Sequence, residues 1–193
     1  FWRQFFFVIL VIIFLLFTYK KNFFNALFDS GIPGFIGGII LGFGFSAYVF
    51  AMYNTTVANT NFIIQTQAIF LAIFGYFFLK EKISKLTLTS IILAISGIIL
   101  MVGNSLSPGQ LSGNIVAFVM PCSFAVLIII VRKYPNVDMI PLQLFAGLVA
   151  MFIGYFISNK INISINDLIL AFIAGFFQVG FGFIFITIGA KKT

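Results

Sequence analysis

The sequence lacks histidine altogether and contains a single cysteine, Cys122. Zinc and haem sites, Cys-His pairs and Ser-His-Asp triads therefore lack their parts, and we expect no metal, no cofactor, no catalytic residue and no enzymatic activity. Charge is scarce as well, since 8% of the 193 residues are charged, against about 25% in a soluble domain. Such a chain cannot cover itself with a polar surface.

Most of the chain is apolar: hydrophobic residues make up 62% of it, and 29 residues are phenylalanine. Apolar runs of about 20 residues are long enough to cross a bilayer as helices. We find seven, at residues 4–19, 32–54, 60–79, 86–103, 112–131, 140–157 and 168–189. The runs are continuous, whereas strands of membrane barrels alternate over about 10 residues. The sequence therefore predicts an all-α, polytopic transmembrane helix bundle.

Lysine and arginine are distributed unequally if the chain crosses at every span. Arg3 and Lys160 fall on one side. The other side holds nine basic residues: Lys20, Lys21, Lys80, Lys82, Lys85, Arg132, Lys133, Lys191 and Lys192. Because basic loops stay in the cytoplasm, we predict residue 1 outside and residue 193 inside. The net charge of +7 is then a feature of topology, and we expect no nucleic-acid partner.

An internal repeat has an offset of 138 residues. The tetrapeptide Gly-Phe-Gly-Phe occurs at 42–45 and at 180–183, and the same offset carries the first span onto the sixth. Five crossings separate the second and seventh spans, so the two copies run in opposite directions, as in many secondary transporters. We predict two inverted five-helix repeats. Residues 1–103 would be the first repeat without its first helix, and 112–193 the second without its last two, so that the chain holds seven of ten spans.

Neutral polar residues gather where the second predicted span meets the third. Asn61 and Gln65 are spaced i, i+4 and share one face of a helix, and Gln178 stands alone in the seventh span. Amides in hydrocarbon need partners, which an aqueous cavity, a polar solute or a neighbouring helix provides. We predict a substrate path bordered by Tyr48, Asn59, Asn61, Gln65 and Gln178.

Small residues and a proline predict how the helices pack. Glycines at helical spacing let helix backbones approach closely, and we assign this role to Gly34, Gly38, Gly42, Gly175, Gly180 and Gly182. Pro121 lies inside the fifth span, where it removes a backbone donor and should kink the helix.

The stretch from Ala51 to Asn59, followed by an apolar helix that ends in the residues from Phe77 to Ile83, resembles the EamA-type members of the drug/metabolite transporter superfamily. The resemblance covers the second to eighth of ten helices. It departs from the family at Lys80, where glycine is usual, and at Ala68, where many members have a helix-breaking proline. It implies the movement of small metabolites, amino acids or drugs, often as export, through a central cavity in a bacterial inner membrane.

Seven spans with an external start raise three classes of function. A secondary transporter that works by alternating access is favoured by the repeat. A seven-helix retinal protein needs a lysine deep in the last helix, but Lys191 and Lys192 lie at its end. An intramembrane enzyme needs acidic or histidine side chains at depth, and these spans contain none. The expected partners are the lipid bilayer and a small-molecule substrate, and a homodimer is left open.

Overall fold

The computed structural model describes residues 1–103, 110–158 and 161–191. Lys160 and Lys192, which entered the predicted orientation, lie outside these ranges. Every regular element in the described ranges is helical, so the predicted all-α bundle is confirmed. In chain order the elements are α1 (Trp2–Tyr19), η1 (Lys20–Asn22), α2 (Phe23–Asp29), α3 (Gly31–Asn54), α4 (Val57–Ile64), α5 (Gln67–Leu79), α6 (Lys85–Gly103), α7 (Leu111–Ala117), α8 (Val119–Lys133), α9 (Ile140–Ile157), α10 (Ile165–Phe172), η2 (Ile173–Phe181) and α11 (Gly182–Ala190).

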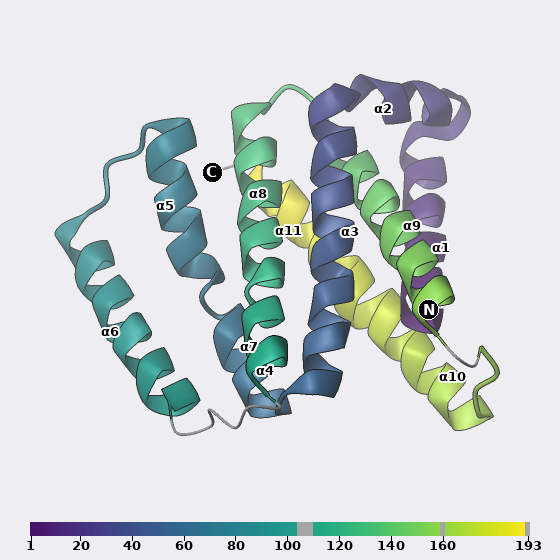
Figure 1. Cartoon of the computed structure of the whole chain (residues 1–193). Helices are drawn as coiled ribbons and strands as arrows, with labels where there is room; N and C mark the ends of the chain where they lie inside the picture. Colours follow the sequence, from purple (N-terminus) through teal and green to yellow (C-terminus); the bar gives the residue numbers. More distant parts are fainter. Residues whose placement is uncertain (104–109, 159–160, 192–193) are drawn as a thin grey trace. The chain divides into compact units, whose positions relative to one another are not determined.

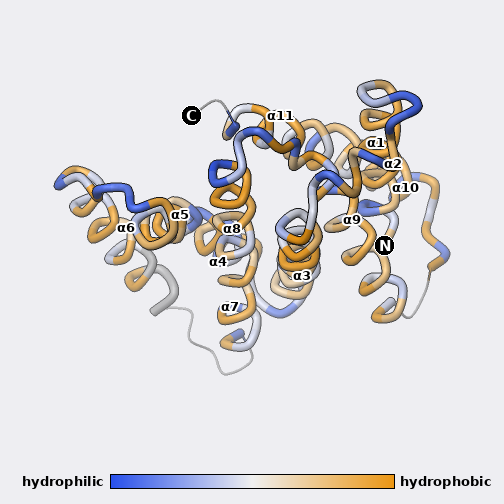
Figure 2. The backbone as a smooth tube through the Cα atoms, turned by 90° about the horizontal axis from the view of Figure 1, so that it is seen from above, coloured by the Kyte–Doolittle hydropathy of each residue, from blue (hydrophilic) through white to orange (hydrophobic). Residues whose placement is uncertain are grey.

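Six helical segments are long and apolar enough to cross a membrane. They are Trp2–Asp29, Gly31–Asn54, Val57–Leu79, Leu111–Lys133, Ile140–Ile157 and Ile165–Ala190. The other predicted span, 86–103, forms α6, in which Lys85–Gly97 make up a shorter apolar helix. Figure 2 shows the helices largely in the colour of apolar residues, with hydrophilic residues concentrated at their ends and in the turns.

The chain folds into two compact units. The terminal unit consists of Phe1–Gly42 with Ile130–Thr193, and the middle unit of Phe43–Ile129. The boundaries fall inside α3 and α8. The predicted repeats, 1–103 and 112–193, divide the chain differently because they describe a duplication of sequence rather than compactness, and they stay a prediction.

Helices α1 and α9 lie antiparallel in the terminal unit (Figure 1). Both ends of the pair are tied by hydrogen bonds. The indole Nε1 of Trp2 donates to the carbonyl of Ile161 at 2.7 Å, and the hydroxyl of Tyr19 donates to the carboxylate of Asp138 at the opposite end. Between these ends the core of the unit is apolar and contains Phe7, Val11, Leu15, Leu142 and Ala146, all at most 1% exposed.

Close glycine contacts join two further helix pairs in this unit. A Cβ at Gly38 would lie 2.7 Å from the carbonyl oxygen of Leu142, and one at Gly42 would lie 2.8 Å from that of Ala146, so α3 packs directly on α9. In the same way a Cβ at Gly175 would meet the carbonyl of Arg3, and one at Gly180 would meet the side chain of Leu10 on α1. At these four glycines an added Cβ would therefore meet atoms of the neighbouring helix.

The two glycine-mediated contacts are related by the offset of the predicted repeat. Helix α9 begins and ends 138 residues after α1, and Gly180 follows Gly42 by the same offset. The contact of α3 with α9 thus has a counterpart at this offset in the contact of η2 with α1. Gly34 also makes a close contact, chiefly with Ser30 of the preceding turn. At Gly182, by contrast, no atom beyond its own helix backbone lies within 4 Å of an added Cβ.

In the middle unit the third predicted span is interrupted. Helix α4 ends at Ile64 and α5 begins at Gln67, and the backbone N–H of Thr66 donates to the carbonyl of Ile63 at 3.0 Å. The hydroxyl of Thr66, which is buried, donates to the same carbonyl at 2.6 Å. The helix therefore breaks without a proline, because a threonine side chain competes for a backbone acceptor.

The fifth predicted span is also interrupted, between α7 and α8 at Phe118. The break lies three residues before Pro121. Proline has no N–H to donate to the preceding turn and its ring crowds that turn. Pro121 was predicted to distort this helix, and the helix is interrupted. The interruption lies about one turn before the proline.

Candidate functional site

Three polar side chains of the middle unit meet where α3 turns into α4. The Thr55 hydroxyl donates to the Oδ1 of Asn114 at 2.5 Å. The Nδ2 of Asn59 lies 3.4 Å from both the Thr55 hydroxyl and the Asn114 Oδ1. Asn59 and Asn114 are each 3% exposed, and the Nδ2 of Asn114 has no partner among the described residues. We refer to Thr55, Asn59 and Asn114 as the asparagine cluster.

The asparagine cluster is held by local backbone geometry. Thr56 is the N-cap of α4, and its side chain accepts the backbone N–H of Asn59 at 3.1 Å, which fixes the start of the helix. On the other side Gly113 brings α7 close to the turn, since a Cβ there would lie 2.6 Å from the carbonyl of Asn54. The Nδ2 of Asn114 can donate a hydrogen bond to a further group.

The other predicted path residues of this unit lie outside the cluster. Asn61 and Gln65 are both exposed, on the last turn of α4 and at its end. Tyr48 is half-buried on α3. Of the residues predicted here, Asn59 makes a polar contact with Asn114 of another helix. The helix break at Gln65 and Thr66 lies directly after the exposed pair.

Gln178 belongs to the terminal unit and lies on η2, which is a π-helix from Ile173 to Phe181. Its side chain is exposed, whereas Gly175 and Gly180 on the same element are buried against α1. π-helical turns are rare and occur frequently at functional sites. The predicted residue therefore lies on a π-helical element.

Sequence reasoning missed an amide inside the terminal unit. Gln143 on α9 is fully buried, and its Nε2 donates to the carbonyl of Phe183 at 2.7 Å and to the hydroxyl of Thr187. The Thr187 hydroxyl in turn donates to the Phe183 carbonyl at 2.9 Å. These bonds join α9 to α11. The position of Gln143 inside an apolar run indicates a buried polar group. No local sequence pattern identifies partners that lie 40 positions away.

Beside this network lies a cavity of about 290 Å³. It is a partly open hollow of the terminal unit, bordered by residues from the end of α1, from the end of α8 and the connection to α9, and from the end of α11. The lining residues are Phe14, Thr18, Val131, Asp138, Met139, Ile140, Thr187, Ile188 and Lys191. Among the residues that the structure describes, no three carboxylate, thiol or imidazole groups gather closely enough to hold a metal ion.

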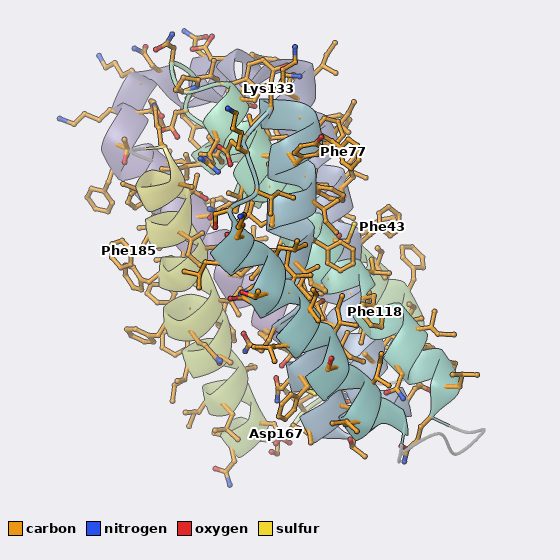
Figure 3. The ribbon with its side chains drawn as sticks, turned by 90° about the vertical axis from the view of Figure 1, so that its left-hand side faces the viewer. Phe43, Phe77, Phe118, Lys133, Asp167 and Phe185 are labelled. Carbon is orange, nitrogen blue, oxygen red and sulfur yellow. The ribbon has the colours of Figure 1, made fainter. Side chains whose placement is uncertain are left out.

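Large apolar side chains point away from both units, as expected where lipid is the solvent. Phe185 on α11 is 64% exposed and Phe77 on α5 is 70% exposed, and both project outward in Figure 3. Lys133 and Asp167 lie at opposite ends of the terminal unit in the same view. Apolar flanks with charged ends, and amides buried within the spans, define a polytopic α-helical membrane protein with polar groups at membrane depth.

Comparison with known proteins identifies the family. The model of the EamA-like transporter family matches residues 1–103, more than half of the chain, and the chain belongs to this family. It is therefore a multi-pass membrane transporter of the drug/metabolite type, and its family is not one of enzymes. No curated protein and no solved structure matches the chain.

Proposed function

We propose that the protein is a secondary transporter that moves small metabolites, amino acids or drugs by alternating access between two inverted repeats. The observation that carries this proposal is the repeated glycine contact, in which α3 packs on α9 as η2 packs on α1. Inverted repeats that exchange equivalent contacts provide the two alternative conformations that alternating access needs. Residues 1–103 and 112–193 are the proposed repeats.

The proposed path is bordered by Tyr48, Asn59, Asn61, Gln65 and Gln178. Exposed amides on α4 and η2 support this assignment, because such groups require polar partners in a bilayer. The proposed direction is export from the cytoplasm of a bacterium across its inner membrane, with the end of Lys20, Lys133 and Lys191 inside. The lipid bilayer and a small-molecule substrate are the proposed partners.

Counterflow in proteoliposomes tests the mechanism. Vesicles that contain the protein are loaded with a pool of unlabelled amino acids and metabolites, and uptake of the labelled pool is measured with and without a proton gradient. A carrier that alternates between two states gives labelled uptake that internal solute accelerates, whereas a channel does not. Protein-free vesicles are the blank, and equal uptake by loaded and empty vesicles contradicts alternating access.

Substitution of the path residues tests the site. We expect Gln178→Leu and Gln65→Leu each to lower the transport rate by about tenfold or more, the effect of removing one charge-assisted or well-placed hydrogen bond to solute. Asn162→Leu, in an exposed connection between α9 and α10, is the matched control and should leave the rate unchanged. Wild-type rates for the two glutamine variants at equal protein levels would remove these residues from the path.

A further inference from the structure

The cavity at the end of the terminal unit contains one acidic and one basic side chain. Asp138 lies in the connection between α8 and α9, and Lys191 follows α11. Two segments far apart in sequence therefore bring the two charged side chains to one cavity. Neither side chain is ion-paired among the described residues. The remaining wall is mostly apolar, with the polar exceptions of two threonine hydroxyls.

The carboxylate of Asp138 is fixed in place by neutral donors. Its Oδ1 accepts the backbone N–H of Ile140 at 3.0 Å, and its Oδ2 accepts the hydroxyl of Tyr19. These bonds orient the group but do not offset its charge, and a carboxylate has lone pairs left for a third and fourth donor. The cavity therefore contains an oriented carboxylate that forms no ion pair among the described residues.

Lys191 has the opposite charge but is not ion-paired with Asp138. Its backbone N–H ends α11 by donating to the carbonyl of Thr187, while its side chain lines the cavity. Lys191 is exposed and Asp138 is half-buried. A ligand with one charge forms a charge-assisted hydrogen bond with one of them and leaves the other to the solvent. A ligand with both charges satisfies both.

We propose that this cavity binds a small zwitterion that carries an apolar group, with its ammonium group at Asp138 and its carboxylate at Lys191. The apolar group packs among Phe14, Val131, Met139 and Ile188. A volume of about 290 Å³ lies at the lower end of ligand pockets, roughly 300 to 1,000 Å³, and limits the solute to a small one. The proposal rests on the proposed transport function and assigns its substrate class and entry end.

Three probes of one shape test the charge requirement. L-Leucine carries both charges, isopentylamine is leucine without the carboxylate, and 4-methylpentanoate is leucine without the amine. Binding to the protein in lipid nanodiscs is measured by titration calorimetry, with L-phenylalanine as a second zwitterion. We expect a zwitterion to bind about tenfold or more tightly than either singly charged analogue, the difference that one charge-assisted hydrogen bond makes. Absence of binding by both zwitterions, or equal binding by the analogues, overturns the proposal.

Two variants assign the charges. Asp138→Asn should abolish the preference for leucine over 4-methylpentanoate, and Lys191→Met should abolish its preference over isopentylamine. The matched controls Asp29→Asn and Lys21→Met change the same charges on exposed residues that do not line the cavity, and should leave both preferences intact. Tyr19→Phe removes a hydrogen bond of Asp138 but keeps its charge, and should retain the preferences. If Asp138→Asn and Lys191→Met behave as wild type, the assignment is wrong.

Counterflow on the same preparation separates this proposal from the transport proposal. Counterflow of any solute, together with charge preferences that the two variants do not change, overturns the cavity assignment and leaves the transporter. The expected charge preferences without counterflow of any solute leave a binding site and overturn the transport mechanism. Counterflow of leucine that both variants reduce supports the two together.

Discussion

At the scale of single residues, two buried glutamines show opposite states of hydrogen bonding. Gln143 donates to two groups of α11. Gln4 on α1 is 4% exposed, and neither its Oε1 nor its Nε2 has a hydrogen-bond partner among the described residues. At the offset of the predicted repeat, Gln4 corresponds to Leu142 in sequence. The predicted second copy therefore has a leucine where the first buries an unpaired amide.

We predict that Gln4→Leu raises the free energy of unfolding by about 1 to 2 kcal/mol, because it removes an amide that is buried without partners. The same change at Gln143 should lower it by about 1 kcal/mol, since it breaks the hydrogen bonds between α9 and α11. Equilibrium unfolding in mixed detergent measures both. The prediction fails if the two substitutions change the free energy in the same direction.

At the scale of elements, the glycines of the terminal unit set the distance between helices. Backbone carbonyls stand where a Cβ would lie at Gly38 and Gly175, and backbone cannot move aside as the end of a flexible side chain can. Gly182 lies on α11 with open space around it. Gly38 and Gly175 thus allow close helix contacts, whereas Gly182, which looks alike in sequence, does not.

We expect Gly38→Ala and Gly175→Ala each to lower the free energy of unfolding by about 1 to 3 kcal/mol, the usual cost of overpacking. Gly182→Ala is the control within the same unit. It should be neutral or stabilising by up to about 1 kcal/mol, because alanine favours a helix over glycine. Thermal unfolding of the three variants in one detergent compares them, and equal losses would contradict the assigned packing.

The end of α5 depends on a residue in a conformation that glycine adopts more readily. Lys80 has φ 57° and ψ 29°, and its backbone N–H and that of Glu81 both donate to the carbonyl of Gly75. Left-handed backbone at a helix end is usually provided by glycine, which has no Cβ to clash with the carbonyl. The family's usual glycine at this position is explained by this turn.

Lys80→Gly should therefore raise the free energy of unfolding by about 1 kcal/mol. Lys82→Gly removes the same charge two residues later, where φ is not positive, and should give no gain. Denaturation of the two variants beside wild type checks this. A gain from both would point to charge rather than backbone conformation as the cause.

Sequence reasoning predicted the elements better than the polar contacts between them. The spans were found because apolar runs have a length that the bilayer dictates, and Pro121 indicated a break because it lacks a donor. The break at Thr66 was not predicted. It depends on which carbonyl a threonine hydroxyl reaches, which varies with local backbone geometry.

At the scale of the whole molecule, the orientation in the membrane stays a prediction. Basic residues at Lys20, Lys21, Lys133 and Lys191 belong to one end of the terminal unit, and the connection from α9 to α10 belongs to the other. The positive-inside rule places the first end in the cytoplasm. Both ends carry exposed residues that a reagent can reach.

Single cysteines introduced in a Cys122→Ser background test this orientation. We predict that a membrane-impermeant maleimide added to intact cells labels Ile163→Cys, in the α9 to α10 connection, and leaves Lys21→Cys unlabelled, because only the first faces outward. Permeabilised cells should label both and serve as the control for reactivity. The reverse pattern in intact cells would invert the topology and with it the proposed entry end.

The sequence by itself determined the membrane class, the approximate spans and the family resemblance, and it predicts the 138-residue repeat. These properties follow from composition, run length and residue identity along the chain. Only the tertiary structure decided that Asn59 meets Asn114, that Gln143 meets Thr187, and that Asp138 and Lys191 share a cavity. Such contacts join segments separated by 40 to 60 residues. Helix packing determines which polar side chains of an apolar bundle face one another, and no local sequence pattern encodes that packing.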